Sequence, residues 1–217
     1  QREKDFPLEK LYMQSVKIKG DIYRSLDDYS RAREHYIQLQ QSGITSYQTI
    51  GAQQALATIL VYEGRIEEAL DSFDEVIRVA RLKGVGGTEL NTRLYKLLLS
   101  IKEMPEAAFE REGDEIHAEL IRRQMLDAKL SEYLIPGFLA EAKGDFNHAL
   151  KIYNEMEEYL FSAGNVWMEF KALRRIISLS RSADFEASAA VARINDLLTH
   201  LGKHATHPAI KGSFIKF

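Results

Sequence analysis

The chain of 217 residues carries 29 basic and 32 acidic side chains, and its formal net charge of -3 argues against nucleic acid or an anionic membrane as the partner. It contains no cysteine, which excludes disulfide bonds and thiolate metal sites and fits a cytoplasmic protein. Hydrophobic residues make up 45% of the sequence, which is enough for a continuous core. The sequence contains no run of about 18 apolar residues, the length that a membrane-spanning helix needs.

Apolar residues recur at three- and four-residue steps, the period of helices packed on one face, and we expect five helical pairs. The first helices of the pairs are expected at about 8–26, 46–63, 88–102, 127–143 and 166–182, and the second at about 29–42, 66–83, 105–125, 146–163 and 185–201. Gly43 and Gly84 follow predicted helix ends. Pro105 falls in the first turn of a helix, where a missing N–H costs nothing, and Pro136-Gly137 predicts a kink.

Five small residues stand at corresponding places in the second helices, namely Ala32, Ala69, Ala107, Ala149 and Ser188. Their steps of 37, 38, 42 and 39 residues indicate a helical solenoid. A small side chain suits a point where two helices cross within about 8–10 Å. We therefore expect one repeat domain over 1–217, with repeats at about 8–43, 46–84, 88–125, 127–164 and 166–202 and a tail at 203–217. The start at Gln1, without a methionine, indicates a fragment of a larger protein.

Three repeats share further positions, which are Gly20, Tyr23, Tyr29, Ala32 and Tyr36 in the first, Ala57, Gly64, Ala69 and Phe73 in the second, and Gly137, Gly144, Asp145, Phe146, Ala149 and Tyr153 in the fourth. This pattern resembles the tetratricopeptide repeat (TPR). Its repeats exceed the common length of about 34 residues, and are similar to the longer-helix variety in bacterial multidomain signalling and transcription regulators. The resemblance implies an all-α fold, a right-handed α-solenoid of about five hairpins. It also implies a concave wall, made by the first helices, that holds a protein, peptide or small ligand.

In that geometry a set of residues on the first helices faces the concave groove. They are Lys17, Asp21, Arg24, Gln54, Thr58, Tyr62, Arg93, Lys96, Leu134, Phe138, Glu141, Arg174 and Arg181. Cations stand at both ends of this set, and Leu134 and Phe138 form an apolar middle. We therefore expect the groove to bind an extended peptide or a helix that carries acidic residues and an apolar anchor. Ordinary solvated helix faces are the alternative interpretation.

Other patterns predict no chemistry of their own. His200, His204 and His207 could share a helical face, but a glycine and a proline interrupt that helix, which favours a polar tail over a metal site. The glycines of 84–87 lack the strand and the Gly-Lys-Ser/Thr of a phosphate-binding loop, which favours a link between repeats. The acidic run at 103–119 suits a solvated helix start, with a docking patch for a basic partner as the alternative. No motif fixes a nucleophile, so we expect neither catalysis nor a cofactor.

The pattern as a whole predicts a non-catalytic protein–protein interaction module within a larger signalling or regulatory protein. The alternative is a sensor domain of a bacterial transcription regulator or kinase, in which a small molecule or signal peptide binds between the third and fifth repeats, near Pro136-Gly137. RNA binding, with one base per repeat, is disfavoured by the near-neutral charge. Neither terminus supplies an obvious polar cap, so a homodimer through the open ends and the presence of flanking repeats both stay open.

Overall fold

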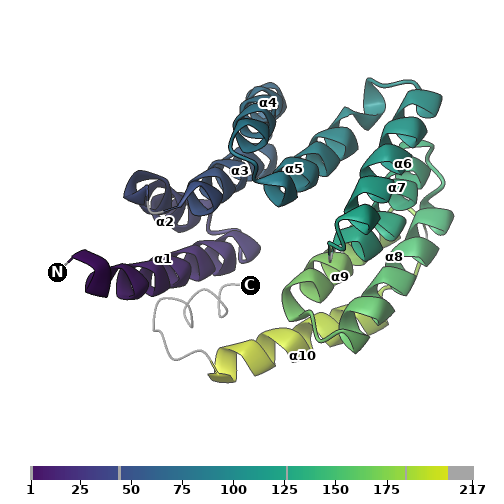
Figure 1. The fold of residues 1–217 in the computed structure, drawn as a ribbon. Helices are drawn as coiled ribbons and strands as arrows, with labels where there is room; N and C mark the ends of the chain where they lie inside the picture. Colours follow the sequence, from purple (N-terminus) through teal and green to yellow (C-terminus); the bar gives the residue numbers. More distant parts are fainter. Residues whose placement is uncertain (1, 44, 126, 184, 205–217) are drawn as a thin grey trace. The chain divides into compact units, whose positions relative to one another are not determined.

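In the computed structural model, the described residues (2–43, 45–125, 127–183 and 185–204) are all-helical, with ten α-helices and no strand among them (Figure 1). The first helices of the pairs are α1 (Arg2–Ser25), α3 (Ser46–Tyr62), α5 (Gly86–Leu99), α7 (Asp127–Ala142) and α9 (Val166–Ser180). The second helices are α2 (Tyr29–Ser42), α4 (Ile66–Leu82), α6 (Glu106–Arg122), α8 (Phe146–Ser162) and α10 (Ser188–His204). The predicted all-α class and helical pairs are thus confirmed. Within these residues no helix combines the length and the apolar character that crossing a membrane requires.

The helix ends follow the local chemistry of the chain, with a few departures from the predicted bounds. The helix expected to reach 102 ends at Leu99 and continues as a 3₁₀ turn, Ser100–Lys102. Pro105 is the residue before α6 and not part of its first turn, with an extended backbone (φ -58°, ψ 138°). Between the helices of a pair, Gly64 and Gly144 adopt φ of 77° and 76°, a left-handed conformation that glycine takes without a Cβ clash.

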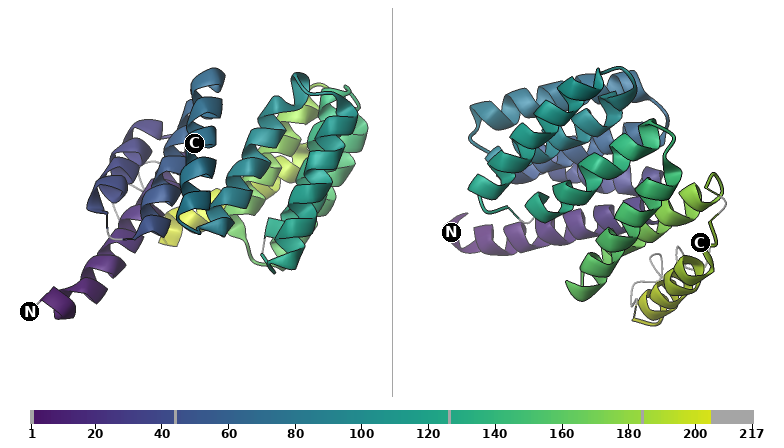
Figure 2. Two further views of the ribbon diagram at one scale, coloured as in Figure 1. Left: turned by 45° about the horizontal axis from the view of Figure 1, so that its top comes forward. Right: turned by 90° about the vertical axis from the view of Figure 1, so that its right-hand side faces the viewer.

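The chain divides into two compact units, with the boundary inside α5, after Lys96. In the first unit, α1 packs on α2, α2 on α3 and α3 on α4, and the purple-to-blue helices of Figure 2 follow this order. Its core includes Ala32, Tyr36 and Phe73, which have almost no exposed surface. The predicted small column is therefore buried at Ala32 and Ala69, as close helix crossing requires, and at Ala149 in the second unit. At Ala107 and Ser188 the prediction was wrong, because both residues are exposed and mark no helix crossing.

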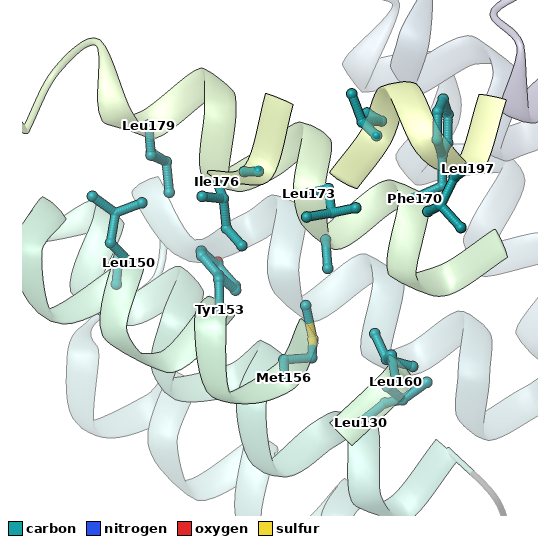
Figure 3. Close-up of a cluster of buried hydrophobic side chains, with 14 of the residues drawn as sticks. Leu130, Leu150, Tyr153, Met156, Leu160, Phe170, Leu173, Ile176, Leu179 and Leu197 are labelled. Atoms are coloured by element: carbon teal, nitrogen blue, oxygen red, sulfur yellow. The ribbon is translucent and has the colours of Figure 1, made fainter. Parts of the chain in front are cut away.

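The second unit has a core of its own, contributed by α7, α8, α9 and α10 (Figure 3). Its largest side chains point toward one another from these four helices and include Leu130, Leu150, Tyr153, Met156, Leu160, Phe170, Leu173, Ile176, Leu179 and Leu197. Full burial of each aliphatic side chain of this size is worth about 1.5–3 kcal/mol. Helix packing in this unit is therefore stabilised by many separate contacts.

Candidate functional site

Tyr36 is held directly over a glycine and points its hydroxyl at a carboxylate. A Cβ on Gly20 of α1 would lie 2.8 Å from Cε1 of Tyr36, so only glycine admits the ring at this point. The Tyr36 hydroxyl donates a hydrogen bond of 2.7 Å to Oδ1 of Asp21. Lys17 Nζ lies 2.6 Å from the other oxygen of Asp21, and Arg24 Nη2 lies 3.4 Å from Oδ1. Three predicted groove residues of α1 therefore form one cluster.

The charges of this cluster are balanced in favour of the ionised carboxylate. Burial opposes the ionisation of Asp21, but Lys17, Arg24 and the hydrogen bonds outweigh it and hold the pKa of the Asp21 carboxyl below its usual value. The same carboxylate and the burial raise the pKa of Tyr36. Two cations against one carboxylate leave the cluster with a net positive charge.

Arg24 is the centre of the arrangement, which we name the Arg24 cluster: Lys17, Asp21 and Arg24 of α1, Tyr36 of α2, Tyr62 of α3 and Tyr95 of α5. The guanidinium lies over the Tyr36 ring, 5.8 Å from its centroid. Burial disfavours the charge of Arg24, whereas the three surrounding phenols and the carboxylate favour it, so its pKa is raised. No hydrogen-bond acceptor among the described residues reaches the buried Nε of Arg24.

The outer rings of the Arg24 cluster are themselves supported by aromatic stacking. Tyr62 stacks on Tyr29 of α2, with centroids 5.3 Å apart and planes 5° from parallel. Tyr95 stacks on Phe73 of α4 at 6.4 Å. Both rings remain partly exposed, at 47% for Tyr62 and 38% for Tyr95. The cluster therefore presents fixed aromatic surface beside a fixed cation.

The second unit has the same glycine–tyrosine contact, but the arginine beside it is paired with a carboxylate through two hydrogen bonds. A Cβ on Gly137 of α7 would lie 2.6 Å from Cε1 of Tyr153. The Tyr153 hydroxyl donates to Glu141 Oε1 at 2.6 Å, and Arg175 of α9 donates Nε to the same oxygen at 2.8 Å and Nη2 to the other. Arg175 also lies 5.0 Å from the centroid of Phe138. In this Glu141 cluster (Phe138, Glu141, Tyr153 and Arg175) the cation is satisfied by an internal bidentate pair.

The remaining predicted residues of the first unit lie on α3 and α5. Thr58 is 5% exposed and donates its hydroxyl to the carbonyl of Gln54, so it is occupied within its own helix. Lys96 pairs with Asp74 of α4 at 2.5 Å. Arg93 lies half-buried on α5. Of the predicted cations on the first unit, Lys17, Arg24 and Lys96 are thus engaged by carboxylates of the chain itself.

In the second unit the predicted apolar middle belongs to the edge of the core. Leu134 and Phe138 are partly buried and pack against the core cluster. Arg174 is exposed, with its guanidinium 6.0 Å from the Phe170 centroid, and Arg181 is the exposed residue that follows α9. The structure thus brings Glu141 together with Phe138 and places the two arginines apart from that cluster.

Sequence reasoning missed Arg175 and Tyr95, which complete the two clusters. Both come from a helix remote in sequence from the carboxylate or arginine that they meet. The sequence does hold a partial signal, because a tyrosine follows the glycine by the same interval in both units and an acid stands close after the glycine. No pattern in the sequence pointed to Arg175.

Two shallow grooves accompany these clusters, one in each unit. The first, of about 480 Å³, lies between α2 and α4 over α3, with apolar walls such as Ile37 and Leu56. The second, of about 490 Å³, lies between α8 and α10 and includes Phe161, Glu157 and Arg193. Within the described part of the chain, no three His, Asp or Glu side chains are grouped to hold a metal ion. His207 lies outside the described residues, so the histidine pattern is not placed.

No protein-family model matches the chain, and no curated protein or solved structure matches it. The consecutive helical pairs are compatible with a helical repeat. The chemistry of the two clusters and the grooves is therefore the basis on which a function can be argued.

Proposed function

We propose that the chain is a cytoplasmic, TPR-like α-solenoid of five hairpins, right-handed, that serves as a non-catalytic interaction module in a larger regulatory protein. We further propose that it binds an acidic protein or peptide segment at the Arg24 cluster. The step of 37 residues between the fully buried Ala32 and Ala69 and the consecutive helical pairs support the repeat architecture. The absence of cysteine supports the location.

The observation that carries the binding proposal is the state of the Arg24 guanidinium. It is fixed by Tyr36 and Asp21 before any partner arrives, and its Nε lacks an acceptor among the described residues. A pre-organised guanidinium loses little conformational entropy when it binds a carboxylate. The Arg24 side chain keeps 16% of its surface exposed, and an acidic side chain that meets it there would offset the net positive charge of the cluster.

The surroundings of Arg24 suit a peptide better than a free ion. Tyr62 and Tyr95 offer partly exposed rings that can pack on apolar side chains next to the acidic group. Arg93, half-buried on α5, is a further cation of the predicted groove and would pair with a second acidic residue of the peptide. The Glu141 cluster offers no equivalent, since Arg175 is held by both oxygens of Glu141.

The direct test compares binding of fluorescent acidic peptides by the parent protein and by Arg24→Gln, using anisotropy. We expect the variant to bind about ten- to a hundredfold more weakly, the range for losing one partner of a desolvated charge pair. Arg175→Gln is the matched control, because it removes the same charge from the cluster whose arginine is already paired. Equal loss in both variants, or none in Arg24→Gln, would refute the site.

A second variant addresses the outer part of the same surface. Arg93→Glu reverses a half-buried charge on α5 and should weaken acidic peptides while leaving the melting temperature unchanged. Lys83→Glu makes the same charge change at an exposed position after α4 and should leave the affinity as it is. Peptides in which glutamate is replaced by glutamine should lose most of their affinity for every version of the protein.

A ligand sensor is the second candidate, favoured by the groove between α8 and α10. Its volume of about 490 Å³ is within the range of small-molecule pockets. The position first suggested by Pro136-Gly137 is less suitable, because the Tyr153 ring covers Gly137. A small cationic metabolite that raises the melting temperature of the parent protein, but not of Glu157→Gln, would support this function. A thermal-shift screen without such a compound would count against it.

A further inference from the structure

The face of α1 that turns away from α2 is apolar and exposed. Leu8, Leu11 and Ile18 are 68%, 61% and 58% exposed; Tyr12, whose hydroxyl accepts a hydrogen bond from Gln38 of α2, lies at the edge of this face at 54%. The opposite side of the helix, which includes Val16, is buried. Large apolar residues gathered on one exposed helix face indicate an interaction surface.

The corresponding face of α3 shows what kind of element covers such a surface. The step of 37 residues that relates Ala32 to Ala69 carries Leu11, Ser15 and Ile18 of α1 onto Gln48, Ala52 and Ala55 of α3, which are 6%, 1% and 7% exposed. These residues lie on the side of α3 opposite Ile50, which packs on α4, and α3 also packs on α2. A helix therefore covers this face in α3, and a helix is the element that fits it in α1.

The far end of the described chain has no matching apolar face. The outward side of α10 carries exposed Ser188, Asn195 and Thr199 and, as its exposed large apolar residue in the described chain, Val191 at 41%. A polar outer helix is how solenoids cap an end. This polar face disfavours stacking of α10 of one copy on α1 of the next, and so favours pairing of the apolar faces with each other.

The apolar face of α1 is complementary to itself in the antiparallel direction. Its seam follows the three- and four-residue alternation of paired helices, in the order Leu8, Leu11, Ser15, Ile18 and Ile22, with Ser15 at the middle. Tyr12 and Lys19 stand equally far on either side of the midpoint between Ser15 and Val16, on one flank of the seam.

Two-fold pairing would therefore place a cation against an aromatic ring on this flank. Lys19 of each copy would face the ring of the partner's Tyr12. We propose that two copies of this chain dimerise through antiparallel α1 helices, with the two-fold axis near Ser15. This goes beyond peptide binding at the Arg24 cluster and does not depend on it.

A disulfide across the axis tests the geometry. The chain has no cysteine, so the thiol introduced by Ser15→Cys is the only one in the protein. We expect mild oxidation to link most of the protein as a dimer, because the two thiols would face each other across the axis. Gln41→Cys, at an exposed position of α2, is the control and should stay largely monomeric. Equal linkage of the two variants would overturn the proposal.

Sedimentation equilibrium tests the interaction without a covalent bond. One helix pair is a small interface, so we expect a dissociation constant in the micromolar range or weaker. Ile18→Glu places a carboxylate in each half of the seam and should raise that constant by about tenfold or more. Leu82→Glu, the same kind of change at a leucine that is 72% exposed on α4, should not. A parent protein that stays monomeric throughout this range would overturn the proposal and leave the face to a helix of another protein.

Discussion

At the scale of single residues, one glycine in each unit decides whether a tyrosine can reach its carboxylate. Tyr36 and Tyr153 lie against Gly20 and Gly137, respectively, and each donates its hydroxyl to an acid of the same first helix. A larger residue at the glycine would push the ring outward and break that hydrogen bond. The glycine therefore serves the polar cluster as well as the close approach of the helices.

Gly137→Ala tests this role. The added Cβ would meet the Tyr153 ring at 2.6 Å, and such overpacking costs typically about 1–3 kcal/mol of unfolding free energy. Gly51→Ala is the matched control, since nothing lies within 4 Å of its added Cβ. Alanine in a helix interior should stabilise that variant by about 0.5–1 kcal/mol. Urea denaturation of both variants gives the comparison, and a stabilising Gly137→Ala would show that the ring is not fixed there.

Asp21 makes the stability depend on acid. Its pKa is lowered in the folded chain, so its contribution is fully present above the unfolded pKa of about 3.9 and is lost as the pH falls through the folded value. Asp21→Asn should therefore be less stable than the parent protein at neutral pH, with a difference that shrinks below about pH 4. Urea denaturation over a pH series measures this difference. Asp71→Asn, at an exposed aspartate, should show no such trend, and a constant difference for Asp21→Asn would contradict the assignment.

At the scale of helices, most boundaries could be predicted because they depend on neighbours in sequence. Apolar periodicity located all ten helices, and turn glycines such as Gly64 marked several ends. The start of α1 at Arg2 was missed, because the periodic apolar pattern begins only at Leu8. The start of α10 was placed at Phe185 and lies at Ser188.

The candidate site could be predicted only in part, because some of its contacts join residues of one helix and others join residues far apart in the sequence. The sequence register placed Lys17, Asp21 and Arg24 on one helix, where spacing alone brings them together. The pairing of Lys96 with Asp74, and of Arg175 with Glu141, joins different helices. Such pairs depend on how far each helix is rotated about its axis and on side-chain rotamers, which the repeat period does not determine.

The contact of α9 with α10 includes a buried ion pair whose effect can be measured. Glu169 is 1% exposed and accepts a 2.6 Å hydrogen bond from Nε of Arg193. Arg193→Met would leave that carboxylate buried without its cation, a loss that typically costs about 3–5 kcal/mol. The double variant Glu169→Gln/Arg193→Met should recover much of it, because no unpaired charge remains.

The exposed pair Glu75–Arg78 within α4 supplies the control for that experiment. Arg78→Met should change the free energy of unfolding by about 0–1 kcal/mol, since a solvated ion pair contributes little. Thermal or urea unfolding of the four proteins gives the ranking. An Arg193→Met variant as stable as Arg78→Met would show that Glu169 finds another partner or takes up a proton.

At the scale of the whole molecule, the helices make their extensive contacts mainly with neighbours in sequence. In the first unit α1 contacts α2, α2 contacts α3 and α3 contacts α4. In the second unit each helix from α6 to α10 contacts the next one in the chain. Each unit has its own buried side chains, so a defect in one core removes contacts chiefly from the helices beside it. Stability should therefore vary along the chain instead of being uniform.

Leu173→Ala tests this distribution. Leu173 is 2% exposed in the core of the second unit, and truncating such a leucine typically costs about 2–5 kcal/mol. Amide hydrogen exchange followed by mass spectrometry should show faster exchange in α7–α10 than in the parent protein, with a smaller change in α1–α4. Val76→Ala, in the core between α3 and α4, should give the reverse pattern. Equal acceleration in both units with either variant would mean that the chain opens as one cooperative body, and that the repeat-like contacts do not set its stability.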